Sequence, residues 1–166
     1  MPQTITCVQL HSHEWARLRD IRLRALLDSP HAFGGTYENE SNFDQSQWHI
    51  EFAKQTFLVA SIDGMDGAMM YVENLEGDFG ATCWIGGCWS DPDFRGMGLM
   101  KSMFAYVDKH APTRDWLVQG LGVWTDNNAA IAAYEKLGFV VMGGPQPSTR
   151  QPGKFYQRMI RKTVSA

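Results

Sequence analysis

Hydrophobic spacing in the first third of the chain predicts a strand followed by two helices. Residues 4–10 form a short strand candidate, and residues 12–28 repeat apolar positions at helical spacing. Ser12 is the expected N-cap, and Ser29 ends the helix because a residue before proline is pushed out of helical space. A second short helix is expected over residues 44–54. The apolar stripe of the first helix consists of Trp15, Leu18, Ile21, Ala25 and Leu26.

The next apolar runs predict three antiparallel strands in succession. Residues 57–62 and 68–74 read as strands, and the Asp-Gly-Met-Asp-Gly segment between them indicates a hairpin turn. Residues 75–80 form a second turn, which leads into a strand that starts near Ala81 and ends at Ser90.

The second half of the chain predicts further alternation of helices and strands. A helix over 98–110 is expected to end before Pro112, and a strand over 115–124 follows; a strand-helix-strand unit gives a parallel pair. Gly138 is expected to cap a helix that starts at Asn127. Two last strands are expected over 139–142 and 155–160, separated by a loop over 143–153, which is rich in Gly, Pro, Gln and Ser.

Composition favours one ordinary globular domain spanning residues 1–166. Hydrophobic residues make up 44% and charged residues 20% of the 166 residues, which is typical of a chain that buries a core. The net charge of −3 and the lack of a lysine-arginine cluster argue against nucleic acid as a partner. No apolar run approaches the ~18 residues of a membrane span, and the first residues do not resemble a signal peptide. We therefore expect a cytoplasmic protein without a membrane partner.

The cysteines give no sign of a metal site. Cys7, Cys83 and Cys88 are widely scattered, and the chain has no Cys-x-x-Cys. The simplest interpretation is reduced thiols, with no zinc.

Residues 84–110 carry the clearest chemistry. A buried strand, a turn, a glycine-containing loop and a helix follow one another directly. Gly96 and Gly98 flank Met97 and let the backbone approach a ligand, and the first turn of the helix offers N–H groups without intrahelical partners. The positive end of the helix dipole adds to the attraction for an anion. A phosphate-bearing cofactor is the natural ligand.

Two common phosphate loops do not match this segment. A Walker loop ends in Gly-Lys-Ser/Thr, whereas Gly98 is followed by Leu99 and Met100. The dinucleotide fingerprint needs a third glycine and a later acidic residue, which are not in place. The Arg-Gly-x-Gly sequence that begins at Arg95 instead resembles the coenzyme A pyrophosphate loop of the GNAT superfamily of N-acetyltransferases.

Residues 127–139 resemble the second GNAT motif. They form a helix led by asparagine, with a tyrosine near its end and a Gly-Phe exit into a strand. The two motifs occur in family order and spacing, and the element order β-α-α-β-β-β-α-β-α-β-β matches the family over nearly the whole chain. The resemblance implies an α/β (α+β) GNAT fold with a mixed, mostly antiparallel sheet of about seven strands flanked by about four helices.

The resemblance also implies acetyl-CoA as acyl donor, no metal, and direct attack by an amine. Backbone N–H groups from Met97 through Lys101 would cradle the pyrophosphate, and Arg95 would add charge. The pantetheine arm would pair with the strand edge at Cys88, Trp89 and Ser90, where an N–H near Trp89 polarises the thioester carbonyl. The implied cofactor-binding residues on the loop are Arg95, Gly96, Met97, Gly98, Leu99, Met100 and Lys101.

Two residues of the second motif have implied roles. Tyr134 matches the family tyrosine that protonates the departing sulfur; the alternative is a core tyrosine with a satisfied hydroxyl. Asn127 suits both a helix N-cap and the family asparagine that bonds the cofactor arm. One side chain is expected to serve one role at a time, and Asn128 could take the other.

The connection between the first two helices commonly forms a wall of the acceptor site in the family. Phe33, Tyr37, Glu38 and Glu40 are therefore candidates for substrate contact, although Phe33 and Tyr37 could simply pin the loop to the core. On the first helix, a solvated basic face is favoured over an arginine that grips the acceptor. That face comprises Arg17, Arg19, Arg22 and Arg24.

The general base and the acceptor are left open. The strand over 81–90 lacks the carboxylate that many family members use; Glu73, Glu38, Asp126 or a water chain could act instead. Met100 stands where the family usually has Gly or Ala. These two departures keep open a non-catalytic acyl-CoA-binding module, against which Tyr134 argues.

A small primary amine is the favoured acceptor, with a protein N-terminus or lysine as the runner-up. A cationic acceptor is weakly suggested by the expected loop carboxylates. A homodimer through Phe155 and Tyr156 is possible. The carboxylates are Glu38, Glu40, Glu73, Glu76 and Asp78.

Overall fold

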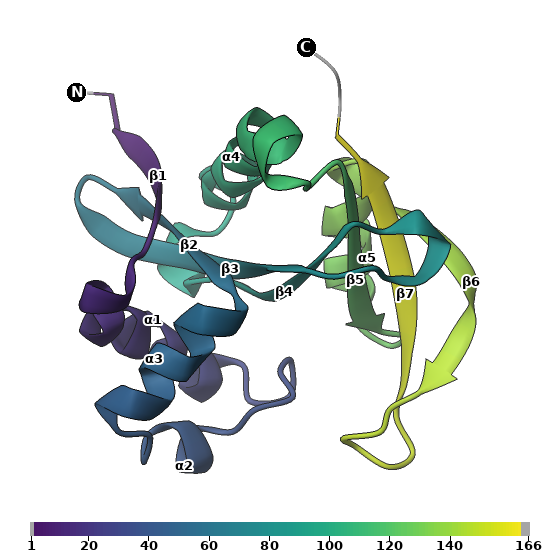
Figure 1. Ribbon diagram of the computed structural model, residues 1–166, viewed down its shortest axis with the longest axis horizontal. Helices are drawn as coiled ribbons and strands as arrows, with labels where there is room; N and C mark the ends of the chain where they lie inside the picture. Colours follow the sequence, from purple (N-terminus) through teal and green to yellow (C-terminus); the bar gives the residue numbers. More distant parts are fainter. Residues whose placement is uncertain (1, 164–166) are drawn as a thin grey trace. The chain divides into compact units, whose positions relative to one another are not determined.

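The computed structural model describes residues 2–163 and places seven strands of this part of the chain in one mixed sheet, with the order β1-β2-β3-β4-β5-β7-β6 (Figure 1). This confirms the expected mixed, mostly antiparallel sheet of about seven strands. The strands are β1 (Ile5–Gln9), β2 (Thr56–Ile62), β3 (Met65–Asn74), β4 (Cys83–Ser90), β5 (Val118–Trp124), β6 (Val140–Pro147) and β7 (Phe155–Lys162).

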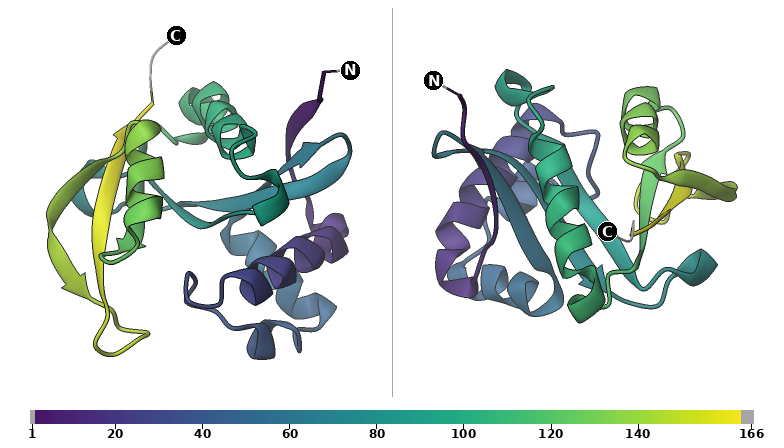
Figure 2. Two further views of the ribbon diagram at one scale, coloured as in Figure 1. Left: turned by 180° about the vertical axis from the view of Figure 1, so that it is seen from behind. Right: turned by 90° about the horizontal axis from the view of Figure 1, so that it is seen from above.

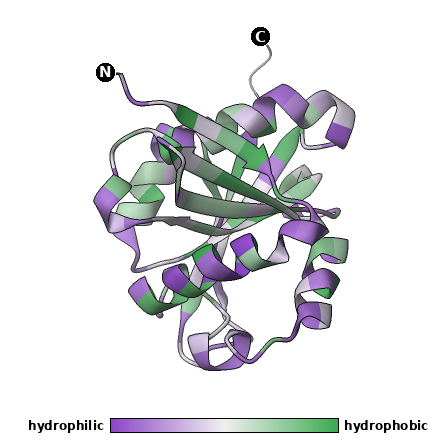
Figure 3. Cartoon of the chain, turned by 90° about the vertical axis from the view of Figure 1, so that its left-hand side faces the viewer, coloured by the Kyte–Doolittle hydropathy of each residue, from purple (hydrophilic) through white to green (hydrophobic). Residues whose placement is uncertain are grey.

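Helices occur where the periodicity predicts them, with one addition. The one-turn helix α2 lies within the connection that was expected to be a loop. Figure 3 shows that the longer helices mix hydrophilic and hydrophobic residues along their length, as amphipathic helices do. The helices are α1 (Trp15–Asp28), α2 (Tyr37–Glu40), α3 (Gln45–Lys54), α4 (Leu99–Arg114) and α5 (Asn128–Lys136), with short 3-10 turns at η1 (Ser12–Glu14), η2 (Asp78–Gly80) and η3 (Pro92–Phe94).

The described residues divide into two compact units. The first contains residues 2–73 and 87–106, and the second contains residues 74–86 and 107–163. Both β4 and α4 begin in one unit and end in the other.

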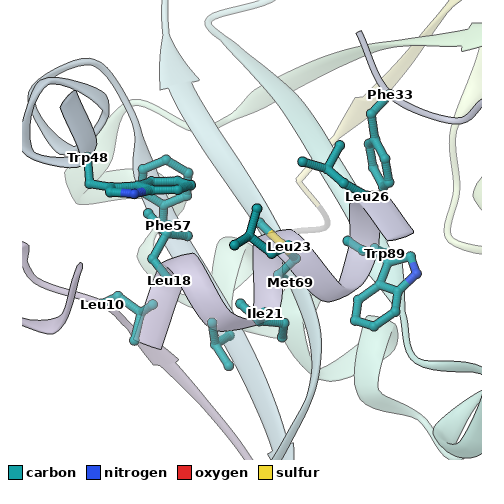
Figure 4. Close-up of a cluster of buried hydrophobic side chains, with 12 residues drawn as sticks. Leu10, Leu18, Ile21, Leu23, Leu26, Phe33, Trp48, Phe57, Met69 and Trp89 are labelled. Atoms are coloured by element: carbon teal, nitrogen blue, oxygen red, sulfur yellow. The ribbon is translucent and has the colours of Figure 1, made fainter. Parts of the chain in front are cut away.

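The first unit contains an apolar core under its strands. Antiparallel pairing joins β1 to β2 and β2 to β3, and α1 and α3 lie on the same face of these strands (Figures 1 and 2). Figure 4 shows Leu18 of α1 near Trp48 and Phe57, and Leu26 at the other end of the helix near Phe33 and Trp89. The predicted stripe is confirmed, with Trp15 only partly buried. The core includes Leu10, Leu18, Ile21, Leu23, Leu26, Phe33, Trp48, Phe57, Met69 and Trp89.

The second unit is built on β5, β7 and β6. These strands pair antiparallel, whereas β4 and β5 pair parallel at Cys83–Gln119 and Trp84–Gly120, as the strand-helix-strand order predicts. Within this unit, Ile85 and Gly86, the next two residues of β4, have no partner on β5. The indole of Trp84 lies over Gly120, where a Cβ would come within 2.8 Å of the ring.

A buried arginine ties the second unit together. Arg161 makes two hydrogen bonds to the carboxylate of Asp108 (2.8 and 2.6 Å) and donates to the side chain of Gln119 (2.8 Å). Its Nε donates to the carbonyl of Leu137 (2.8 Å), the residue that ends α5. Because Arg161 is 6% exposed, these bonds offset the cost of burying its charge.

Four local expectations are wrong in detail. Ser12 is not an N-cap, because His11 caps the 3-10 turn that precedes α1. The hairpin turn shrinks to two residues, Asp63 and Gly64, whose φ angles of 50° and 83° suit a tight primed turn. Helix α4 continues through Pro112, and β6 extends into the expected loop. Across residues 2–163, no helix is both long and apolar enough to cross a membrane.

Candidate active site

The loop from Arg95 to Gly98 depends on its two glycines for its backbone conformation. Gly96 and Gly98 adopt φ angles of +78° and +91°, a region that other residues rarely enter. The loop is anchored in the first unit, because Leu99 is 2% exposed and packs with Phe94 against Gly67. A Cβ on Gly67 would lie 2.6 Å from Leu99 Cδ1. The loop is therefore held at both of its ends.

The backbone N–H groups after this loop are available to an anion. Helix α4 makes its first hydrogen bond from Ser102 N to the carbonyl of Gly98 (3.0 Å). Within residues 2–163, the N–H groups of 97–101 donate no hydrogen bond. Five N–H groups at the positive end of a helix make a geometry that suits a phosphate. Met97 and Lys101 are exposed and Met100 is half-buried.

Arg95 is already engaged by the protein. Its Nε donates to the carbonyl of Ser90 (2.9 Å) and its Nη2 donates to Asp28 Oδ2 (3.0 Å), while the side chain stays 53% exposed. The same oxygen accepts from Trp89 Nε1 (2.9 Å) and Ser29 Oγ (2.8 Å). These bonds, that from Trp89 above all, hold the pKa of Asp28 below its ordinary value. An incoming pyrophosphate would share Arg95 with Asp28.

Asp91 stabilises the turn between β4 and the loop. Its carboxylate accepts from Asp93 N (2.9 Å) and from Arg24 Nη2 (2.7 Å). The hydrogen bond from Arg24 lowers the pKa of Asp91. The backbone of Asp91 also donates to the carbonyl of Gly67 (2.8 Å). The turn that leads into the loop is therefore fixed to both α1 and β3.

The end of β4 carries the predicted cofactor edge. Trp89 is 4% exposed, whereas Cys88 and Ser90 are half-buried. Gly87 bends the strand just before them, with a φ angle of +62°. The side chain of Trp89 is committed to the core and to Asp28, which is consistent with a role for this edge through its backbone.

Two of the three thiols are poor nucleophiles, and none of the three forms a disulfide. Cys7, Cys83 and Cys88 form no disulfide. Burial raises the pKa of Cys7 to about 11 and that of Cys83 to about 12, so both thiols stay protonated. Among residues 2–163, no group of three or more His, Cys, Asp or Glu side chains is arranged to hold a metal ion.

Helix α5, in the second unit, presents the two residues of the other motif. Asn127 caps the helix, since its Oδ1 accepts from Ala130 N (3.2 Å). This leaves its Nδ2 group as a donor, so one amide can serve both roles. Tyr134 is half-buried and meets Phe139 edge-on, with ring centroids 5.7 Å apart. Gly138 ends the helix with a φ angle of +103°, as predicted.

The predicted acceptor residues differ in their surroundings. Phe33 is 8% exposed and belongs to the core, which fits the interpretation that it pins the loop. Tyr37 is 40% exposed, and Glu38 is also exposed. Glu73 is half-buried and makes no ion pair within the described residues. Asp126, another candidate base, is exposed.

The interpretation of the arginines on α1 as a solvated face is wrong for three of the four. Arg17 makes two hydrogen bonds to Asp66, both 2.8 Å. Arg22 pairs with Glu40 (2.8 and 3.0 Å), and Arg24 pairs with Asp91. Although burial raises the pKa of Asp66, hydrogen bonds from Arg17 and Ser61 bring it below its ordinary value. These arginines therefore pair with carboxylates on β3, on α2 and at the start of η3.

Sequence reasoning missed Asp28 and the bend at Gly87. Nothing near Asp28 in the sequence indicates that three donors would converge on it. A signal for Gly87 does exist, because a glycine inside a strand pattern often marks a bulge. The structure gathers the loop and the β4 edge around Asp28 in the first unit, whereas Asn127 and Tyr134 belong to the second unit.

Solved structures of acetyltransferases share this fold at low sequence identity. A GNAT-family acetyltransferase from Streptococcus pneumoniae is 15% identical, with a TM-score of 0.77 over 97% of this chain and 100% of that one. The protein yncA from Salmonella typhimurium, solved with its cofactor acetyl-CoA, is 17% identical with a TM-score of 0.72, covering 98% and 95%. The ribosomal-protein-S18-alanine N-acetyltransferase from Escherichia coli is 18% identical with a TM-score of 0.67, covering 98% and 96%.

Sequence comparison gives the family directly. No curated protein sequence matches the chain significantly. A sequence model described as "Acetyltransferase (GNAT) family" matches residues 15–139, which include both the Arg95 loop and the Asn127 helix. Enzymes of this family use acetyl-CoA as acyl donor and need no metal. This chain therefore belongs to the GNAT acetyltransferase family.

Proposed function

We propose that the protein transfers an acetyl group from acetyl-CoA to the primary amine of a small molecule. The observation that carries this proposal is the row of N–H groups at residues 97–101, which have no hydrogen-bond acceptor within the described chain and follow two glycines at positive φ. These groups suit the pyrophosphate of coenzyme A. The structural neighbour yncA was solved with acetyl-CoA, which supports the same donor.

The proposed reaction is a direct attack on the thioester. The backbone N–H near Trp89 polarises the carbonyl, the neutral amine nitrogen forms the new C–N bond, and the C–S bond breaks. Tyr134 supplies a proton to the departing sulfur, and the amine loses its proton to a base. Glu73 is the favoured base on the first unit, because it is half-buried and makes no ion pair there.

Two successive experiments test the binding of acetyl-CoA and the transfer of its acetyl group. Thermal melting with and without acetyl-CoA first tests binding, which stabilises the folded state by mass action. Thiol release from acetyl-CoA across a panel of primary amines then tests turnover. A melting shift with amine-dependent release supports the proposal. A shift without release on any amine would favour a non-catalytic acyl-CoA-binding module, and no shift would refute the assignment of the Arg95 loop.

A protein N-terminus is the second candidate acceptor. Neighbours of the same fold include enzymes named for acetylating ribosomal proteins, such as the S18-alanine enzyme from Escherichia coli. Peptides that begin with alanine or serine therefore belong in the panel. Acetylation of these peptides in preference to small amines would transfer the proposal to this acceptor class.

A further inference from the structure

We propose that the acceptor carries a carboxylate as well as its amine, and that Arg22 binds this carboxylate. This inference rests on the proposed acetyltransferase activity and names its substrate class, an amino acid or a similar amino carboxylate. It replaces the weak expectation of a cationic acceptor. The residues that carry it all lie in the first unit of the structure.

Arg22 points from α1 toward the bend in β4. Its Nη1 lies 3.7 Å from the position of a Cβ at Gly87, on the side-chain face of the strand. Gly87 directly precedes Cys88 and Trp89, the edge proposed to hold the thioester. A charged group on the acceptor that reached Arg22 Nη1 would thus lie beside the proposed site of transfer.

Only part of the guanidinium is used by the protein. Nε and Nη2 donate to the two oxygens of Glu40 (2.8 and 3.0 Å), and Phe33 stacks on the group at 5.0 Å. Nη1 makes no hydrogen bond within residues 2–163, and it is not among the fully buried polar atoms that have no partner. The side chain is 15% exposed, so this donor is sheltered yet still reached by solvent. An arginine in this state can give a charge-assisted hydrogen bond to an oxygen anion.

The pairing with Glu40 also selects the kind of ligand. Glu40 was expected to contribute negative charge to a cation site, but its carboxylate is 12% exposed and is neutralised by Arg22. Gly35 packs directly on the pair, since a Cβ there would collide with Glu40 Oε2. The pair is oriented with its positive end toward β4. Its net charge of zero favours a monoanionic carboxylate over a dianionic phosphate.

A negative charge, that of Glu73, lies on the face of β3 that α1 covers. The pairing of β2 with β3 is irregular near Gly67. After this point, side chains at every second residue of β3 share a face of the sheet. Met69 is on this face and packs in the core beneath α1. Tyr71 lies at the Gly87 bend, with its ring 3.1 Å from the Cβ position, and Glu73 follows two residues later. A cation donor and a carboxylate acceptor on one face suit a zwitterion, with the ammonium directed toward Glu73.

The test is a competition between matched acceptors. Protein with acetyl-CoA is given an equimolar mixture of amino acids and their decarboxylated amines, and the acetylated products are identified by mass spectrometry. The variant is Arg22→Gln combined with Glu40→Gln, which removes both charges together and leaves a pair able to hydrogen-bond. Arg19→Gln is the control, because Arg19 lies on the same helix and makes no ion pair with any residue from 2 to 163. Binding of the best amino acid to the protein, with and without coenzyme A, is measured by calorimetry.

We expect amino acids to be acetylated at least about tenfold faster than their decarboxylated partners. The double variant should lose this preference through a higher KM for the amino acid, with the KM for acetyl-CoA unchanged. Arg19→Gln should retain the preference. Acetylation without preference for a carboxylate, or a preference that survives in the double variant, would overturn the inference and leave the proposed function intact.

The remaining outcomes separate the two proposals. If acetyl-CoA gives no melting shift, the proposed function fails, and calorimetry on the unliganded protein then decides whether Arg22 binds an amino carboxylate. Absence of binding in wild type, or equal binding in wild type and the double variant, overturns the inference. If the double variant is unfolded by circular dichroism, Arg22→Lys serves in its place, since lysine keeps the charge but cannot engage Glu40 and a ligand in the same planar geometry.

Discussion

The Arg95 loop and helix α5 carry the two family motifs, and they present their chemistry in different ways. The loop offers backbone N–H groups at residues 97–101 and relies on glycines at positive φ. Helix α5 offers side chains, with Asn127 as its N-cap and Tyr134 about two turns later, near its end. The loop should therefore depend on conformation and tolerate changes of side chain, whereas α5 should be sensitive to single functional groups.

The largest expected effect comes from removing one oxygen on α5. Tyr134→Phe should lower kcat by roughly 10²–10⁴-fold, because it removes the proposed proton donor to the sulfur. The ring contact with Phe139 needs no hydroxyl, so the fold should be kept. Thiol release measures kcat, and the melting shift with acetyl-CoA should stay unchanged. A kcat within a few-fold of wild type would assign Tyr134 to the core instead.

The second effect tests the loop through its backbone. Gly98→Ala places a side chain at a φ angle of +91°, which costs about 1–3 kcal/mol if the loop keeps its shape. A cost of this size appears as lower stability, or as roughly tenfold or greater weakening of acetyl-CoA binding if the loop relaxes. Calorimetry measures the affinity for acetyl-CoA, and urea unfolding measures the stability.

Met97→Ala is the matched control for the loop. Met97 is 41% exposed and lies between the two glycines, so its truncation leaves the backbone free to keep its conformation. We expect acetyl-CoA affinity to change by less than about twofold. A larger loss in Met97→Ala than in Gly98→Ala would reverse the contrast between backbone and side-chain chemistry.

A third, smaller effect concerns the cap of α5. Asn127→Ala removes the acceptor for Ala130 N and should destabilise the protein by about 0.5–2 kcal/mol in urea unfolding. Asn128→Ala, one residue later, removes no capping bond and should be close to neutral. If Asn127 also bonds the cofactor arm through Nδ2, Asn127→Asp, which keeps the cap but not the donor, should weaken acetyl-CoA binding alone.

The smallest effect is a pH dependence in the turn before the loop. Arg24 lowers the pKa of Asp91 in the folded protein, so the stability that this pair adds is fully present above the ordinary carboxyl pKa of about 3.9 and is lost as pH falls below it. The pair is partly exposed, which limits its contribution to about 1 kcal/mol. The stability difference between wild type and Asp91→Asn should therefore shrink between pH 6 and pH 3, as measured by urea unfolding at about these two pH values.

Local signals predicted the elements more accurately than their ends. The stripe on α1, the parallel β4–β5 pair and the glycine ends of the Arg95 loop and of α5 are all as expected. Pro112 was expected to end α4, but it lies in the last turn of the helix and the chain continues to Arg114 before Asp115 turns it at a φ angle of 58°. A proline tends to end a helix, but the packing of Val107 and Ala111 in the interior outweighs this tendency in α4.

In the candidate site, too, the local features were predictable from the sequence and the distant partners were not. The roles proposed for residues 95–101 follow from a contiguous motif, since glycine spacing and a helix start act over a few neighbouring residues. The partners of Arg22, Arg24 and Arg95 could not be read from the sequence, because each lies 18 to 67 positions away. An arginine on a helix can be paired or solvated, and only the arrival of a distant carboxylate decides which.

The sequence by itself determined the family and the order of the elements, because these depend on periodicity and on short spacings along the chain. Tertiary structure alone decided that Glu40 is neutralised, that Asp28 collects three donors, and that Arg22 keeps one donor at the Gly87 bend. Charge and hydrogen-bonding capacity are properties of residues, but whether they remain available for a ligand depends on which residues folding places beside them.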